Sequence, residues 1–221
     1  MELICSSSRL PEKHLKIINN KPAIMQLINR LRFAKKIRNI VVCTTTDKSD
    51  DKLVDYLQKN DIVFFRGSEK DVLARFLDAA KYFQTDIIID VEGDKIYTDP
   101  AYVDKIVEIM ENGKIDFVIG SHSQTFDPMD HFVHGVIPAG VRVNALEKLC
   151  SIKKSNDTET GYKEFFTSSE LFTKYYLNPE DVPNESKKIR LTLDYEEDLK
   201  LANQIFKDIG DKFTLSDMAS I

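Results

Sequence analysis

The chain has 221 residues, of which 42% are hydrophobic and 30% are charged. This composition is typical of a folded globular protein and excludes a disordered one. The net charge of −5 argues against a broad basic surface for duplex nucleic acid. The apolar runs are far shorter than the ~18 residues of a membrane-spanning helix, and the first residues lead into a serine run rather than a signal peptide. We therefore expect a cytoplasmic protein that binds neither nucleic acid nor membrane.

The three cysteines, Cys5, Cys43 and Cys150, are widely spaced and odd in number. They form no pattern with each other or with histidine. Neither a zinc site nor a disulfide framework is expected.

Short apolar runs alternate along the chain with longer segments of helical period. The expected strands are residues 3–5, 40–43, 62–65, 86–91, 116–120 and 188–193. The expected helices begin at Pro22 and then cover residues 49–59, 69–83, 100–112 and 196–209. This alternation predicts an α/β fold, Rossmann-like, with a mostly parallel central sheet and helices on both faces.

Residues 121–185 lack this regular alternation and are rich in aromatic side chains. The segment is too short and irregular to build a core of its own. We interpret it as an insertion within a single domain that covers residues 1–221.

Polar residues follow four of the expected strands, and the carboxyl ends of parallel strands meet at one edge of a sheet. The first strand leads into a serine run with Arg9 and Lys13, which offers hydroxyls, backbone N–H groups and cations to phosphates. Asp94 and Asp194 follow later strands and offer the hard oxygen ligands that suit Mg²⁺. A phosphate loop beside paired carboxylates indicates nucleotidyl transfer.

Each of these features also has an ordinary structural explanation. Asp194 precedes a helix that it could cap. Gly67 and Ser68 could simply begin a helix, and the serine run could be a plain turn. Only their joint placement at one edge favours nucleotide chemistry.

Several motifs resemble those of the cytidylyltransferases that make CMP-sugars, a group that includes the 3-deoxy-manno-octulosonate (KDO) enzymes. Residues 7–13 (SSRLPEK) resemble the loop S-x-R-L-P-x-K, and residues 65–75 (FRGSEKDVLAR) closely resemble F-R-G-S-x-x-D-V-L-x-R of the spore coat polysaccharide branch. Residues 91–94 (VEGD) are similar to V-Q-G-D, and residues 193–199 (LDYEEDL) to the closing D-T-P-E-D-L. The chain is identified as a member of this group, closest to the spore coat branch.

The resemblance implies that an acceptor oxygen attacks the α-phosphorus of CTP and that pyrophosphate leaves. The implied catalytic residues are Arg9 and Lys13, which would hold the triphosphate, and Asp94 and Asp194, which would bind Mg²⁺. The other residues implied to contact CTP are Ser6, Ser7, Ser8, Thr44, Arg66, Gly67, Ser68, Asp71 and Arg75. The implied acceptor is an acidic sugar or a related small molecule for surface glycan synthesis. Residues 121–185 would hold it and form a homodimer.

The chain also departs from the pattern of this group. An upstream Arg is absent, Glu12 replaces the usual Gly before Lys13, Glu92 replaces Gln, and Lys95-Ile96 replace Cys-Pro or Glu-Pro. Two alternatives therefore stay open, a sugar-nucleotide glycosyltransferase and a catalytically impaired nucleotide-binding protein.

The acceptor side is less defined. Arg142 could meet an acceptor carboxylate or phosphate, and His131 and His134 lie nearby in the sequence. A surface arginine and partly buried histidines would explain these residues equally well.

Overall fold

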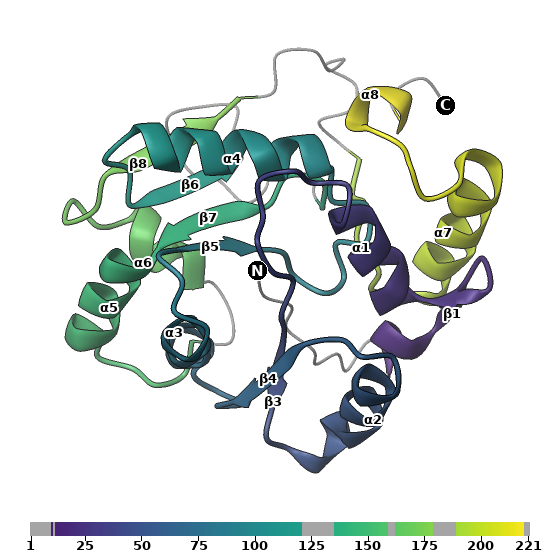
Figure 1. The fold of residues 1–221 in the computed structure, drawn as a ribbon, viewed down its shortest axis with the longest axis horizontal. Helices are drawn as coiled ribbons and strands as arrows, with labels where there is room; N and C mark the ends of the chain where they lie inside the picture. The colour runs from purple at the N-terminus through teal and green to yellow at the C-terminus, as the bar shows by residue number, and fades with distance from the viewer. Residues whose placement is uncertain (1–9, 11, 121–134, 159–161, 179–188, 219–221) are drawn as a thin grey trace.

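The computed structural model describes residues 10, 12–120, 135–158, 162–178 and 189–218 (Figure 1). The expected strand at 3–5, the serine loop at 6–8, Arg9, His131 and His134 lie outside the described residues. None of the described helices is long and apolar enough to cross a membrane.

A four-stranded mixed sheet forms the centre of the fold, with the strand order β5-β7-β6-β8. β5 (Ile87–Asp90) and β6 (Phe117–Gly120) both pair antiparallel with β7 (Ala139–Arg142), which lies between them. β8 (Lys174–Leu177) pairs parallel with β6. A second, parallel pair consists of β3 (Val42–Thr45) and β4 (Phe64–Gly67).

The remaining elements are helices and one hairpin. The α-helices are α1 (Ala23–Leu31), α2 (Asp51–Lys59), α3 (Val72–Tyr82), α4 (Pro100–Asn112), α5 (Val143–Ile152), α6 (Tyr162–Thr167), α7 (Glu196–Ile209) and α8 (Leu215–Met218). The 3₁₀ turns are η1 (Lys13–Leu15) and η2 (Lys48–Asp50), and the hairpin pairs β1 (Ile17–Ile18) with β2 (Lys21–Pro22).

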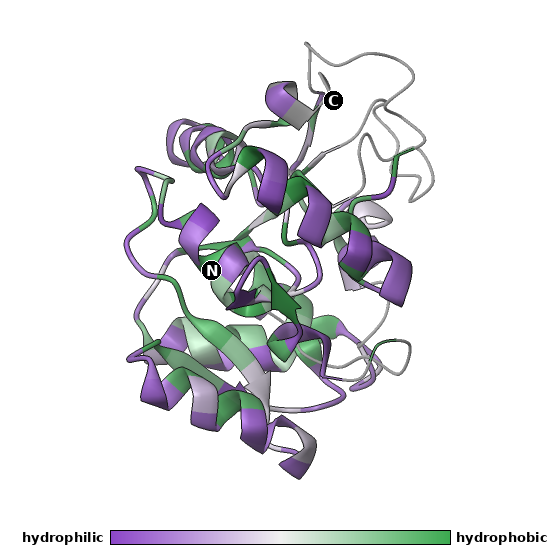
Figure 2. Ribbon diagram, turned by 90° about the vertical axis from the view of Figure 1, so that its right-hand side faces the viewer, coloured by the Kyte–Doolittle hydropathy of each residue, from purple (hydrophilic) through white to green (hydrophobic). Residues whose placement is uncertain are grey.

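Apolar side chains on the strands alternate between two faces, and each face is covered by helices. On one face Ile89 and Val118 pack with α4 in a core that also includes α1 and α7. On the other face Ile88 and Phe117 pack with α3, α5 and α6. Figure 2 shows the hydrophilic residues on the outer sides of the helices. The predicted α/β class, Rossmann-like with helices on both faces, is confirmed.

Residues 121–185, which we interpret from the sequence as an insertion because they lack the regular alternation of strands and helices, contribute to the central sheet in their described part. This part supplies β7 and β8, and β7 lies between β5 and β6. The four residues of β7 include Gly140 and Ala139, whose small side chains give a weak strand signal. Gly140 is required because α4 crosses it closely. A Cβ at this position would lie 2.5 Å from both Ile106 Cγ2 and Met110 Sδ.

The expected strand at 188–193 is also not formed in its described part, which has a single bridge residue, Arg190. The alternating pattern is present, but the backbone amide of Leu193 donates to the carbonyl of Asp94 in a loop. Loop contacts replace strand pairing here, and they bring the chain before α7 against the end of β5.

A buried arginine that shows no signal in the sequence joins α1 to the C-terminal part of the chain. Arg30 is fully buried and donates to the backbone carbonyls of Tyr97, Thr98, Asp211 and Phe213. Its guanidinium also stacks over the Phe213 ring at 3.6 Å. These contacts fix α1 and the loop before α4 relative to each other.

The close approach of α4 to β7 gives a first prediction. Gly140→Ala should lower the free energy of unfolding by about 1–3 kcal/mol, because the added methyl group overpacks the interface with α4. Chemical denaturation of both proteins measures this difference. The matched control is Gly113→Ala, where the nearest atoms lie 3.1 Å from the new Cβ. Equal stability of Gly140→Ala and the unmodified protein would contradict the proposed close packing.

Candidate functional site

The side chain of Lys13 brings together two carboxylates that are distant in the sequence. Its Nζ atom lies 3.0 Å from Asp94 Oδ2 and 3.4 Å from Asp194 Oδ1. The Lys13 side chain is only 5% exposed. Because both contacts share one nitrogen, the two carboxylate oxygens cannot be farther apart than these two distances combined. The sequence-based expectation that Asp94 and Asp194 meet at one edge agrees with this geometry.

Backbone contacts explain why these residues meet. The hairpin β1–β2 turns at Asn19 and Asn20, which both have positive φ, as tight hairpins of this kind require. The Asn19 side chain donates to the Phe206 carbonyl on α7 at 2.9 Å. The hairpin therefore fixes η1 against α7, and the bond from Leu193 to Asp94 places the start of α7 beside the end of β5.

The N-cap position of α7 is occupied by Tyr195 rather than by Asp194. The side chain of Asp198 accepts the backbone N–H groups of Asp194 and Tyr195, each at 2.8 Å. Asp194 Oδ2 instead accepts from Thr192 Oγ1 at 2.9 Å and pairs with Arg190 at 3.0 Å. The capping explanation for Asp194 is thus replaced by a side chain oriented toward Lys13.

The pair of carboxylates has the chemistry of a divalent cation site. Asp94 Oδ1 is buried and has no hydrogen-bond donor among the described residues. A buried carboxylate oxygen without a donor has the lone pairs that a hard cation such as Mg²⁺ requires. Within the described parts of the chain, no cluster of three or more His, Cys, Asp or Glu residues provides a larger metal site.

The backbone before Lys13 shows how Glu12 fits at a position where the resemblance implies Gly. Glu12 has φ 53° and ψ 30°, the left-handed conformation that Gly adopts most readily. Its carboxylate pairs with Lys52 on α2 rather than with Lys13. The residue therefore keeps the backbone conformation of Gly, and Lys52 neutralises the added charge.

His14 adds no charge to the site at neutral pH. It is buried, and neither ring nitrogen has a hydrogen-bond partner among the described residues. Burial, together with the nearby Lys13 ammonium, lowers the pKa of His14 to about 3. The imidazole is therefore neutral and packs behind Lys13.

Thr44 and Arg66, both expected to contact CTP, make bonds within the protein. The Thr44 hydroxyl is buried and donates to Asp50 Oδ2 at 2.5 Å. The Arg66 guanidinium donates to the Thr45 and Asp47 carbonyls and pairs with Asp51 at 2.8 Å. These bonds fix the carboxyl ends of β3 and β4 together, and the Arg66 side chain remains 27% exposed.

The stretch 67–75 forms a compact local motif between β4 and α3. Asp71 caps α3 by accepting from the Ala74 N–H at 3.1 Å, and it also pairs with Lys153. Ser68 Oγ accepts from the Asp71 N–H at 3.1 Å, and Arg75 donates to the Ser68 carbonyl. Arg75 is fully buried directly beneath Gly67, where a Cβ would lie 2.8 Å from Arg75 Cγ. The expected binding residues Asp71 and Arg75 thus have structural partners, and their role toward CTP stays a prediction.

For Arg142 the structure favours the ordinary structural explanation over contact with an acceptor, because its side chain binds backbone carbonyls far from Asp94. It pairs in register with Ile87, at the start of β5, whereas Asp94 follows the end of β5. Its guanidinium donates to the carbonyls of Met110, Gly113 and Ile115. β7 runs antiparallel to β5, which the sequence pattern does not reveal. This direction places Arg142 near the start of β5, at the end of the strands opposite to Asp94.

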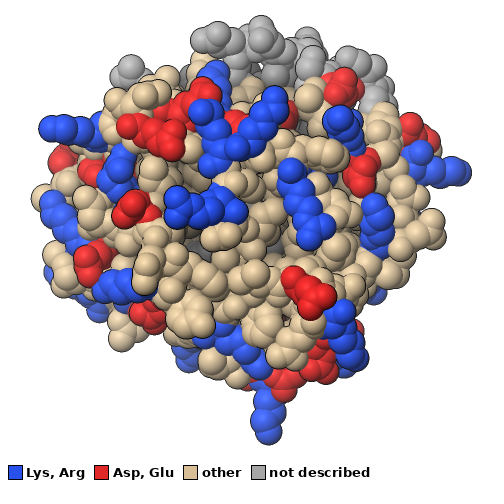
Figure 3. Space-filling view, viewed as in Figure 1, with Lys and Arg blue, Asp and Glu red and all other residues tan. Residues whose placement is uncertain are grey.

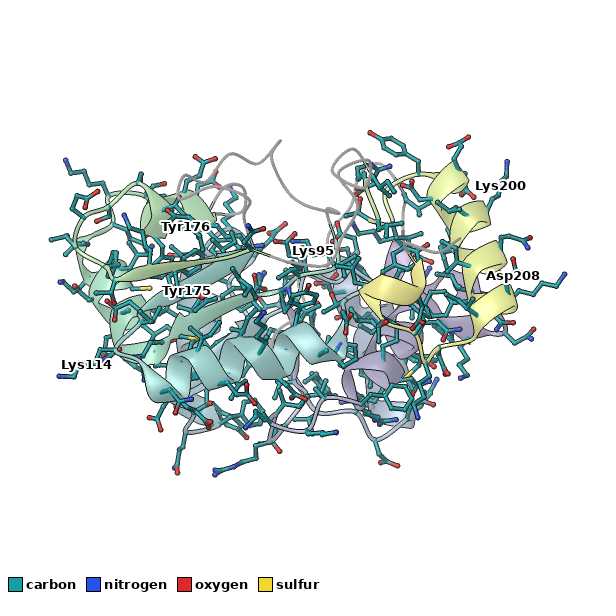
Figure 4. The ribbon with its side chains drawn as sticks, turned by 90° about the horizontal axis from the view of Figure 1, so that it is seen from above. Lys95, Lys114, Tyr175, Tyr176, Lys200 and Asp208 are labelled. Carbon is teal, nitrogen blue, oxygen red and sulfur yellow. The ribbon has the colours of Figure 1, made fainter. Side chains whose placement is uncertain are left out.

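A charged cluster that the sequence did not indicate as a site lies beside Asp94. Glu92 pairs with Lys95 at 3.2 Å and with Lys163 of α6, and Lys163 lies 3.6 Å from Asp90 Oδ2. Figure 4 shows Lys95 between the sheet and the half of the molecule that carries α7. In the sequence, Glu92 and Lys95 depart from the motifs of the CMP-sugar cytidylyltransferases, and these departures indicate the cluster. Nothing in the sequence indicates Lys163.

The two carboxyl groups of this cluster differ in pKa. Burial raises the pKa of Asp90 to about 6, the Glu92 charge adds to the rise, and Lys163 opposes it. The Lys163 and Lys95 ammoniums outweigh the burial of Glu92 and lower its pKa. Neither oxygen of Asp90 has a hydrogen-bond partner among the described residues.

On the face of the molecule shown in Figure 3, acidic and basic side chains are interspersed and no extended basic field is present. This distribution agrees with the negative net charge. It offers no broad electrostatic surface for a polyanion on this face.

Comparison with known proteins gives the class first. A sequence model of the cytidylyltransferase family matches residues 5–205. The α/β fold with its polar edge is that of a nucleotidyltransferase. The chain belongs to the cytidylyltransferase family, and the resemblance found in the sequence is confirmed.

Individual relatives agree with this assignment. An uncharacterized protein of Methanocaldococcus jannaschii is 31% identical over 204 residues, which cover 91% of this chain and 79% of that protein. The spore coat polysaccharide biosynthesis protein SpsF of Bacillus subtilis is 25% identical and covers 93% of this chain and 84% of its own.

Solved structures give the same fold. A cytidylyltransferase from Leptospira borgpetersenii matches with a TM-score of 0.81 and 29% identity, over 99% of this chain and 90% of its own. The structure of CMP:2-keto-3-deoxy-manno-octonic acid synthetase complexed with CTP has a TM-score of 0.68 and 14% identity, over 93% of this chain and 97% of its own.

The raised pKa of Asp90 gives a second prediction. Above pH 6 the folded protein holds Asp90 buried and ionised, with no hydrogen bond from the described residues, which opposes folding, and this penalty fades as the pH falls from 6 toward 4. Asp90→Asn should therefore raise the free energy of unfolding by about 1–3 kcal/mol at pH 8, and the gain should shrink at pH 5. Denaturant titrations at both pH values measure it.

The control for this prediction is Asp208→Asn, a change at an exposed residue of α7. It should give no such pH-dependent difference. A loss of stability in Asp90→Asn at pH 8 would show that the ionised carboxylate stabilises the cluster.

Proposed function

We propose that the protein is a Mg²⁺-dependent cytidylyltransferase that transfers CMP from CTP to an acidic sugar or a related small acceptor, releasing pyrophosphate, for surface glycan synthesis. The observation that carries the proposal is the convergence of Lys13, Asp94 and Asp194 at one point. SpsF is named for spore coat polysaccharide biosynthesis, and further relatives from Shewanella species are named 8-amino-3,8-dideoxy-manno-octulosonate cytidylyltransferases. These names support an acidic sugar as the acceptor.

The roles of the residues follow from charge. The reaction places the acceptor oxygen on the α-phosphorus of CTP, breaks its bond to the bridging oxygen, and releases the β- and γ-phosphates as pyrophosphate. Arg9 and Lys13 hold the outer phosphates, where negative charge builds on the leaving group. Asp94 and Asp194 would hold the Mg²⁺ ion, which when bound offsets charge on the phosphates. No side chain needs to form a covalent intermediate.

The two cations Arg9 and Lys13 favour a cytidylyltransferase over a glycosyltransferase. A triphosphate that leaves as pyrophosphate requires cations next to its outer phosphates, and the loop that ends at Lys13 provides them. The deciding experiment measures pyrophosphate release from CTP with a panel of acidic sugars, polyol phosphates and phosphonates. Release with an acidic sugar supports the proposal. Binding of CTP without release for any acceptor would favour the catalytically impaired alternative.

The carboxylates give a third prediction. Asp94→Asn should reduce the rate of pyrophosphate release at least 100-fold, because a neutral amide is a much weaker ligand for Mg²⁺ than a carboxylate. Circular dichroism should show an unchanged fold. The control Asp211→Asn removes a surface ion pair with Lys21 and should keep its activity. Full activity in Asp94→Asn would remove Asp94 from the metal site.

The phosphate loop gives a fourth prediction. At saturating Mg²⁺, Lys13→Ala should weaken CTP binding roughly ten- to a hundred-fold, the value of one charge-assisted hydrogen bond. CMP binding should change much less, because CMP lacks the outer phosphates. Calorimetric titration of both nucleotides measures the difference. An equal loss for CTP and CMP would mean that Lys13 does not contact the outer phosphates.

A further inference from the structure

The Lys13 ammonium lies at the position where the carboxylate pair would receive a cation. It contacts one oxygen of Asp94 and one oxygen of Asp194. All three side chains are largely buried, with exposures of 5%, 19% and 9%. Lys16, three residues later, makes an ordinary surface ion pair with Glu196. The buried bridge is therefore specific to Lys13.

Electrostatics explains why the Asp94–Asp194 pair requires a cation beside it. Two carboxylates buried side by side repel each other, and leaving a buried charge uncompensated is strongly unfavourable. The positive charge of Lys13 stabilises both of them. A divalent ion bound to the same oxygens would lie within a few ångströms of the ammonium and would be repelled by it. The two cations therefore compete for one pair of ligands.

The same lysine has a second set of partners in the proposed function, on which this inference rests. The outer phosphates of CTP carry more negative charge than the carboxylate pair, and they suit an ammonium equally well. A triphosphate can thus draw the Lys13 side chain away from Asp94 and Asp194.

We propose that Lys13 is an internal counter-ion that keeps free divalent metal ions from the Asp94–Asp194 pair. The metal ion then binds only together with a triphosphate, which moves the ammonium from the carboxylates to the phosphates. In the nucleotide-free protein, the apparent affinity for metal is lowered by the small fraction of molecules in which Lys13 has left the pair.

The test measures metal binding without nucleotide. Mn²⁺ alone is titrated into the protein and free Mn²⁺ is followed by electron paramagnetic resonance. The unmodified protein should bind weakly, and Lys13→Met should bind at least ten times more tightly. Two controls apply. Lys16→Met should bind as weakly as the unmodified protein, and Lys13→Met combined with Asp94→Asn should lose the tight binding.

A second measurement uses thermal unfolding of the same proteins. Mn²⁺ should raise the melting temperature of Lys13→Met, in which Asp94 has lost its ion pair with Lys13 and Asp194 retains only its pair with Arg190 among the ion pairs described above, and should hardly change that of the unmodified protein. Equal Mn²⁺ affinity in Lys13→Met and the unmodified protein would overturn the inference. Tight binding of Mn²⁺ to the unmodified protein that is lost in Asp94→Asn would also overturn the inference. This result does not require Lys13→Met to fold.

These outcomes are independent of the proposed function. A protein that releases no pyrophosphate from CTP would contradict the cytidylyltransferase proposal and leave the Mn²⁺ results unchanged. Normal pyrophosphate release combined with tight Mn²⁺ binding in the absence of CTP would overturn only the inference about Lys13.

Discussion

One ammonium group stabilises the edge of the sheet at which three distant parts of the chain meet. Lys13 bridges Asp94 and Asp194, which are 81 and 181 residues away from it in the sequence. Without this cation, two carboxylates would lie side by side with Arg190 pairing only with Asp194, and the loss of one partner from a buried ion pair is costly. The hairpin on α7 and the backbone bond between Leu193 and Asp94 both hold the chain in the geometry that this ion pair requires.

Two departures from the motifs of the family, Glu12 and Glu92, are each paired with a nearby lysine. Glu12 adopts the backbone conformation of a glycine, and Lys52 neutralises it. Glu92 pairs with Lys95 and Lys163. The negative charge of each glutamate is therefore paired with lysine within this chain. The site thus retains the carboxylates and the lysine on which the proposed chemistry depends.

The elements that could be predicted from the sequence are those in which the local pattern and the fold agree. Residues 40–42 and 87–89 are continuous β-branched runs, and such runs form strands that are buried on both sides. The meeting of Asp94 with Asp194 was predicted from the rule that strand ends converge, but a loop contact between Leu193 and Asp94, rather than a strand before Asp194, brings the two residues together. β7 and the opposite position of Arg142 could not be predicted, because strand direction leaves no local signal. Lys163 was missed because one lysine on a six-residue helix has no pattern.

The long span of the Lys13 bridge has a consequence for how the protein is made. During translation, Lys13 and Asp94 emerge from the ribosome well before Asp194 has been synthesised. The carbonyl groups of Asp211 and Phe213, which Arg30 binds, emerge later still. Until then, Arg30 and Lys13 of the nascent chain lack these partners. Contacts of such long sequence separation form slowly. The edge of the sheet that carries Lys13, Asp94 and Asp194 is thus completed only after Asp194 and the residues that follow it have been translated, and until then the growing chain depends on the earlier apolar packing for its order.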